Sequence, residues 1–120
     1  MTREEFEKLV VEALKGLPKE FKRRMKNVGI VIEDHPSPKL LREMGMRPPD
    51  TLLGLYQGVP LDARGSWYGG VLPDKITLFQ RPLEEASRSP EELKKNVRDT
   101  VMHEIGHHFG LEEEELEKYE

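Results

Sequence analysis

The residues best placed to do chemistry lie near the C-terminus, in the run His103-Glu104-Ile105-Gly106-His107. On a helix, His-Glu-x-x-His places two imidazoles on one face, where both can bind the same zinc ion, with a glutamate beside them that can act as a general base. His103 and His107 lie about 40° apart around such a helix. The motif therefore predicts a metal-dependent hydrolase, first of all a peptidase. We expect His103 and His107 to be metal ligands and Glu104 to be the catalytic base.

A third ligand is needed, because catalytic zinc usually has three protein ligands and one water. In one class of such enzymes this ligand is a glutamate on a later helix, but the thirteen residues after His107 are too few for a second long helix to return. In the other class a glycine ends the helix, and the ligand follows three residues later. Gly110 and Glu113 occupy those positions, so we expect Glu113 to be the third ligand. The adjacent glutamates at 112, 114 and 115 leave this register open by one residue.

His108 is expected to have a different role from its neighbour His107. It falls about 20° from Val101 on the helical wheel, on the side that packs, and about 140° from His103. The two therefore cannot share a metal on an unbroken helix. We interpret His108 as a structural histidine, hydrogen-bonded within or beneath the core.

The helix that must carry the motif has strong end signals. Ser89 is a candidate N-cap, Pro90 takes the first helical position and Glu92 completes a capping box. Gly110 is expected to end the helix in a left-handed conformation, after about Phe109. The buried stripe of this helix is predicted to consist of Val97, Val101, Ile105 and Phe109.

The rest of the chain supplies further helices and about three strands. A capping box at Thr2 and Glu5 predicts a helix whose apolar stripe runs from Phe6 to Leu17. Shorter helical segments are expected at 18–26 and 38–44, and strands at 28–33, 52–57 and 75–80, the last ended by Pro82. A Gly- and Pro-rich connection at 58–74 carries Trp67 and Tyr68, which could line a cleft or pack in the core. We predict a single α+β domain over residues 1–120.

Composition excludes several other classes of protein. There is no cysteine, so any metal must be held by nitrogen and oxygen ligands. The net charge of −4 argues against nucleic-acid binding, and no apolar run is long enough to span a bilayer. The N-terminus has no basic region followed by an apolar one, as a secretory signal would. A cytoplasmic location is therefore expected, with a peptide or protein as the partner.

Several separated segments resemble the small bacterial zincin-like metallopeptidase family. They are the runs 97–111 (VRDTVMHEIGHHFGL), 53–61 (LGLYQGVPL), 65–68 (GSWY) and 72–79 (LPDKITLF). The resemblance implies a minimal zincin fold, in which a small mixed sheet of three to four strands packs on an N-terminal helix and a C-terminal active-site helix. It also implies one Zn²⁺ on His103, His107 and Glu113, with Glu104 as base. In zincins an edge strand commonly pairs with the extended substrate, and residues 75–80 are our candidate for that strand.

Two other functions compete with peptide hydrolysis. The small size of the chain leaves little room for a deep cleft, so a zinc-binding regulatory or interaction module with little or no activity is the main alternative. A zinc nuclease like the bacterial RNA-maturation endonucleases is the second. Those enzymes carry three histidines and lack the glutamate after the first, so Glu104 and the acidic net charge argue against this reading.

Overall fold

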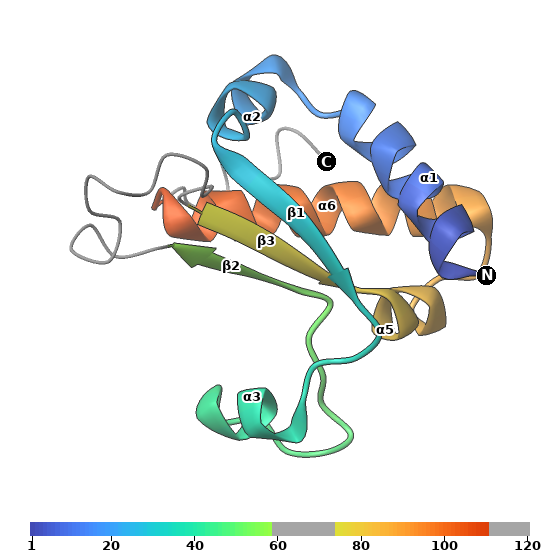
Figure 1. Cartoon of the computed structure of the whole chain (residues 1–120), viewed down its shortest axis with the longest axis vertical. Coiled ribbons are helices and arrows are strands. Elements are labelled where there is room, and N and C mark those ends of the chain that lie inside the picture. The colour runs from blue at the N-terminus through green and yellow to red at the C-terminus, as the bar shows by residue number, and fades with distance from the viewer. Residues whose placement is uncertain (59–73, 111–120) are drawn as a thin grey trace.

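A mixed three-stranded sheet lies in front of the longest helix of the protein (Figure 1). The computed structural model describes residues 1–58 and 74–110. Within these ranges the strands are β1 (Val28–Glu33), β2 (Gly54–Gly58) and β3 (Asp74–Phe79), in the spatial order β1-β3-β2. β1 runs parallel to β3, with Val28 opposite Asp74, whereas β2 runs antiparallel to β3, with Gly54 opposite Leu78. This confirms the predicted α+β fold with a small mixed sheet.

Two well-capped helices back this sheet. In α1 (Arg3–Lys15) the Thr2 side chain accepts a hydrogen bond from the Glu5 amide, and the Glu5 carboxylate accepts one from the Thr2 amide. In α6 (Pro90–His108) the Ser89 hydroxyl accepts from the amide of Glu92. Each cap satisfies amides that the first helical turn leaves without partners. Gly110 follows α6 with a φ of +73°, the left-handed conformation expected of it.

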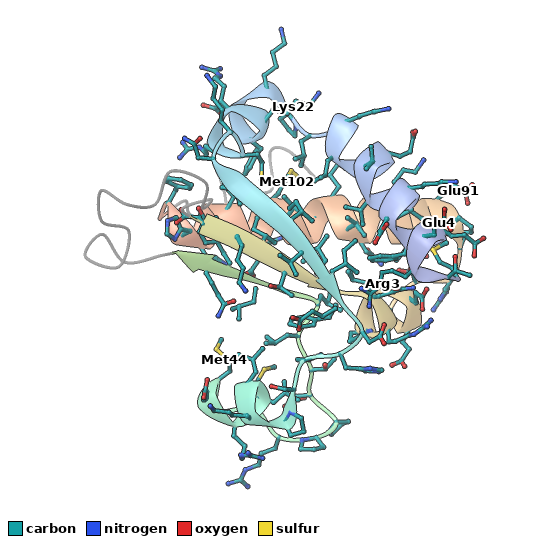
Figure 2. The ribbon with its side chains drawn as sticks, viewed as in Figure 1. Arg3, Glu4, Lys22, Met44, Glu91 and Met102 are labelled. Carbon is teal, nitrogen blue, oxygen red and sulfur yellow. The ribbon has the colours of Figure 1, made fainter. Side chains whose placement is uncertain are left out.

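The hydrophobic core lies between the sheet and these two helices. Its sheet side is formed by Ile76 and Leu78 of β3, both fully buried. Met102 of α6, labelled in Figure 2, is also buried. The remaining core residues are Phe6, Leu9, Val10, Ala13, Leu17, Phe21, Leu83, Leu93, Val97, Val101 and Ile105. The core thus fixes α6 along one stripe and leaves its other faces available for a site.

The other three helices within the described residues are short. α2 (Lys19–Arg24) and α3 (Pro38–Glu43) were anticipated, and α3 lies apart from the other helices (Figure 1). α5 (Gln80–Glu85) was not predicted, because Pro82 was interpreted only as the end of a strand. Proline is tolerated in a first helical turn, where its missing N–H has no partner to lose, and the chain passes directly from β3 into α5. None of the helices in residues 1–58 and 74–110 has the length and apolarity required to cross a bilayer.

The strand order corrects one prediction about the sheet. Residues 75–80 were expected to be an edge strand that pairs with substrate, but β3 is the central strand and is paired on both sides. Within the described sheet, β2 is the edge strand beside α6. Strand order depends on pairings between distant segments, and the sequential order of the strands does not reveal it.

Candidate active site

The two motif histidines lie together on the C-terminal half of α6. Their ring centroids are 6.3 Å apart, with ring planes inclined by 62°. Zn–N bonds are about 2.0–2.1 Å long, so two imidazoles on one ion have centroids roughly 5–6 Å apart. His103 is half-buried and His107 is exposed. The pair is therefore close to the spacing that one shared ion requires, and it is accessible from solvent.

The backbone of α6 sets the tautomer of His103. Its Nδ1 lies 2.8 Å from the carbonyl oxygen of Asp99, one turn earlier in the helix. A carbonyl oxygen only accepts, so Nδ1 must carry the proton and donate it. In the neutral ring the lone pair is then on Nε2, the nitrogen that a metal would use. This outer hydrogen bond is typical of metal-binding histidines, and the donor set thus fits a zinc ion.

Glu104 is held by the edge of the sheet. Its Oε1 accepts a hydrogen bond of 2.9 Å from the backbone N–H of Tyr56 in β2. The N–H of Phe79 donates to the carbonyl of Leu53, so residues 53, 55 and 57 form the hydrogen-bonded pairs with β3. The amide of Tyr56 consequently points away from β3, toward α6. The helix supplies the carboxylate and the outer edge of the sheet orients it.

Close contact between β2 and α6 depends on Gly54. A Cβ atom built on this residue would lie 2.7 Å from Cγ2 of Thr100 and 3.2 Å from the carbonyl oxygen of Thr77. A glycine inside a strand can mark a close backbone approach, and that signal was present in the sequence. The contact between Gly54 and Thr100 and the hydrogen bond from Tyr56 to Glu104 were nevertheless not predicted from the sequence.

His108 lies on the side of α6 that faces the sheet, as the helical wheel indicated, but it is not in the core. Its ring stacks on Tyr56 with centroids 4.0 Å apart and planes inclined by 16°. Its Nε2 lies 3.9 Å from Oδ2 of Asp74, which accepts a 2.6 Å hydrogen bond from the Tyr56 hydroxyl. The side chain is 40% exposed. The prediction of a structural histidine within or beneath the core was therefore wrong about its depth.

Phe109 was also predicted to be more buried than it is. It was assigned to the buried stripe, but it is 44% exposed, and the Arg24 guanidinium lies 4.8 Å from its ring centroid. Val97, Val101 and Ile105 are fully buried, as predicted. The stripe thus ends with Ile105, because the last turn of α6 lies over the end of β2 and leaves the core.

A cleft of about 340 Å³ opens beside the motif. Its walls are the segment 51–54, which leads into β2, and one flank of α6 (Asn96, Asp99, Thr100, His103 and Glu104). The cleft therefore adjoins one candidate ligand and the candidate base. In residues 1–58 and 74–110, no three His, Asp or Glu side chains gather closely enough to hold a metal. The expected third ligand, Glu113, lies outside the described residues, as do Trp67 and Tyr68.

The site thus combines a small mixed sheet, a helix with His-Glu-x-x-His behind it, and a glutamate whose carboxylate is anchored by the edge of the sheet. The model of the zincin-like metallopeptidase family matches residues 25–120. The chain therefore belongs to this family.

A solved structure also resembles the chain. It is a conserved hypothetical protein from Thermus thermophilus, 26% identical, with a TM-score of 0.59. The match covers 91% of this chain and 94% of that one. No curated protein matches the chain. The comparisons thus support the family and the fold, and name no substrate.

Proposed function

We propose that the protein is a zinc-dependent peptidase in which His103, His107 and Glu113 bind one Zn²⁺ and Glu104 is the general base. The observation that carries the proposal is the pairing of two hydrogen bonds on neighbouring residues. One bond, to the Asp99 carbonyl, sets His103 in the tautomer that suits a metal. The other, from the Tyr56 amide, fixes the carboxylate of Glu104 beside it. A helix that bore the motif by chance would not require either bond.

The proposed chemistry divides between the metal and the chain. Zinc, when bound, would polarise the scissile carbonyl and lower the pKa of water to about 7. Glu104 takes the proton of the attacking water and passes it to the leaving amine. The Tyr56 amide holds Oε1 of Glu104, so that the other oxygen of the carboxylate can face the water.

The proposed substrate is an extended peptide that adds to the edge of β2. The outward-facing backbone groups of β2 belong to Gly54, Tyr56 and Gly58, which alternate with the residues bonded to β3. The Tyr56 N–H already donates to Glu104, so a peptide would pair with the groups of Gly54 and Gly58. A peptide paired there would receive its affinity from main-chain hydrogen bonds, as in other cases of strand addition. It would also pass the cleft beside His103 and Glu104.

Elemental analysis and one pair of variants test the proposal. The purified protein should contain one zinc per chain and hydrolyse members of a peptide library. Glu104→Gln should retain zinc and lose about 10²–10⁴-fold in kcat/KM, the range of general acid–base contributions. Glu91→Gln, at the exposed start of the same helix (Figure 2), is the matched control and should keep full activity. Equal rates for Glu104→Gln and the parent would refute the assignment of the base.

One observation favours the alternative, a zinc-binding module with little or no activity. Oε1 of Glu104 already accepts a hydrogen bond, and a carboxylate with such a purely structural role would also be retained in an inactive protein. Under this alternative the protein binds zinc, cleaves no peptide in the library, and Glu104→Gln lowers its thermal stability without a change in zinc content.

A further inference from the structure

The cleft beside the motif extends from the proposed reaction centre toward the start of α6. Asp99 and Thr100 lie one helical turn before His103 and Glu104, and Asn96 lies about one turn earlier again. One turn is about 5.4 Å along the axis. A substrate side chain next to the scissile bond could therefore reach Asp99 if it were long and unbranched. This inference rests on the proposed peptidase function.

The opposite wall would suit an aliphatic stem. Leu52 and Leu53 line it together with Thr51 and Gly54. The close approach of Gly54 to Thr100 limits the width of the cleft at the end near Glu104. Such a narrow passage with leucines on one side favours a slender chain of methylene groups over a bulky ring.

Asp99 supplies a carboxylate to the cleft, one turn before the motif. Its side chain is 16% exposed, and its Oδ2 accepts a 2.6 Å hydrogen bond from Lys95. Its other oxygen, Oδ1, is buried and has no hydrogen-bond partner in the described part of the chain. No lysine or arginine lines the cleft among the described residues. A buried carboxylate oxygen without a partner is costly in a folded protein. A cation in the cleft would meet the exposed part of this side chain in competition with Lys95, and Oδ1 would gain a donor if the side chain turned toward the cleft.

We propose that this cleft is a specificity pocket for a basic residue of the substrate, lysine or arginine, adjacent to the scissile bond. Its methylene groups would lie along Leu52 and Leu53, and its cationic end would pair with the Asp99 carboxylate. Asn96 and Thr100 add polar groups to the same flank. Lys95 is then a competitor: it neutralises part of Asp99 in the absence of substrate.

A binding measurement tests the pocket separately from catalysis. Zinc-loaded Glu104→Gln is titrated with fluorescent peptides from a position-scanned set that differ only in lysine or norleucine, a side chain of similar shape without charge. At one position lysine should bind at least about tenfold tighter than norleucine. Binding with no preference at any position, or no binding of any peptide, overturns the proposal.

Two variants assign the preference to Asp99. In the Glu104→Gln background, Asp99→Asn should reduce the lysine-to-norleucine ratio to about twofold or less, while the Asp99 carbonyl that holds His103 is retained. Lys95→Met removes the competing cation and should increase the ratio. Glu91→Gln makes the same change of charge on the same helix outside the cleft, and should leave the ratio unchanged. A role of the Lys95–Asp99 pair in stability alone would alter the unfolding temperature and not the ratio.

The outcomes separate this proposal from the proposed function. If the parent protein cleaves no peptide but the Asp99-dependent preference holds, the peptidase function fails and the pocket stands. If the parent cleaves peptides with equal kcat/KM for lysine and norleucine at every position, the function stands and the pocket is refuted.

Discussion

Two clusters of polar side chains lie at the opposite ends of strand β3. The two clusters differ in their hydrogen-bond partners. After the C-terminal end of β3 lies Gln80, which is fully buried. The side-chain oxygen of Gln80 accepts a hydrogen bond from Arg3, and its side-chain NH₂ group donates to the Met1 carbonyl and to Glu84. Arg3 also bonds the Ile32 carbonyl and Asp34 (Figure 2). This cluster ties α1, β1 and α5 together.

At the N-terminal end of β3, Asp74 belongs to a cluster of the opposite kind. The Asp74–Tyr56–His108 contacts are part-buried, and His107 beside them is exposed. The first cluster has the buried Gln80 at its centre and the more exposed Arg3 and Asp34 at its rim, and its bonds join three elements of the fold. At the second cluster, the imidazoles of His107 and His108 are exposed. Beside it, the backbone of α6 orients the ring of His103, and the backbone of β2 orients the carboxylate of Glu104. Polar groups at the two ends of one strand can therefore differ in kind: one set joins elements of the fold, and the other lies beside the proposed reaction site.

The largest effect is expected from His107→Ala. Removal of a direct ligand should weaken zinc binding by more than the 10–100-fold typical for the loss of an outer partner. The metal-free protein should unfold at nearly the same temperature as the parent, because His107 is exposed. Competition with a chromogenic chelator measures the affinity, and His35→Ala, at an exposed bend, is the control. Unchanged affinity for His107→Ala would remove it from the ligand set.

Gln80→Leu should act on stability instead. It leaves the Arg3 guanidinium without one of its acceptors, and we expect a loss of about 2–3 kcal/mol in the free energy of unfolding, as for hydrogen bonds to charged groups. Zinc affinity should not change. Urea unfolding provides the measurement, with Gln57→Leu on the exposed part of β2 as the control, expected within about 0.5 kcal/mol of the parent. A large loss of zinc affinity in Gln80→Leu would contradict the separation of the two clusters.

His108→Ala should have a smaller effect on stability, about 1 kcal/mol, because it removes one stacked ring from a part-exposed position. Its zinc affinity should remain within a few-fold of the parent. His108→Phe keeps an aromatic ring on Tyr56 and should recover most of the stability. Loss of the metal from both variants would show that the helical wheel assigned His108 wrongly.

The smallest expected effect is on the pH dependence of stability, through Glu84 beside Gln80. Desolvation raises the pKa of Glu84, but hydrogen bonds from Gln80 and Arg81 oppose it, and the net pKa lies below the usual 4.5. A lowered pKa in the folded state stabilises the protein above the unfolded value, and that contribution is lost as the pH falls through the folded value. Glu84→Gln should therefore be slightly less stable at neutral pH and lose less on acidification below about 4.5. Urea unfolding across this range checks the difference in slope, and parallel curves would contradict it.

Features set by neighbouring residues were predicted well from the sequence. The caps at Thr2 and Ser89 and the left-handed Gly110 depend on residues within one turn, so their patterns are sufficient. The angular positions of the α6 side chains follow from helical geometry, and the buried residues 97, 101 and 105 agree with it. The wheel carries no information on where along the helix the core ends. For that reason it misplaced His108 and Phe109.

Features set by distant segments were not predictable in the same way. The central position of β3 results from two pairings, one with a strand more than forty residues earlier along the chain. The hydrogen bond between Tyr56 and Glu104 joins residues 48 positions apart. Gly54 was a usable sign that β2 meets another element closely, but it does not say which element. The ligand assignments of His103, His107 and Glu113 stay predictions from the motif.

The donor that holds Glu104 is a main-chain amide, and this has a consequence for how the site tolerates change. Every residue type except proline supplies the same N–H at position 56, so drift in side-chain identity there leaves the contact intact. A one-residue insertion or deletion ahead of β2 that shifts its pairing would still turn a main-chain N–H toward the carboxylate, but it would bring a leucine, Leu53 or Leu55, to the place of Gly54, where a Cβ meets Thr100 at 2.7 Å. The contact with Glu104 thus tolerates a change of side chain at position 56, whereas a one-residue change of length ahead of β2 should be poorly tolerated because it displaces Gly54.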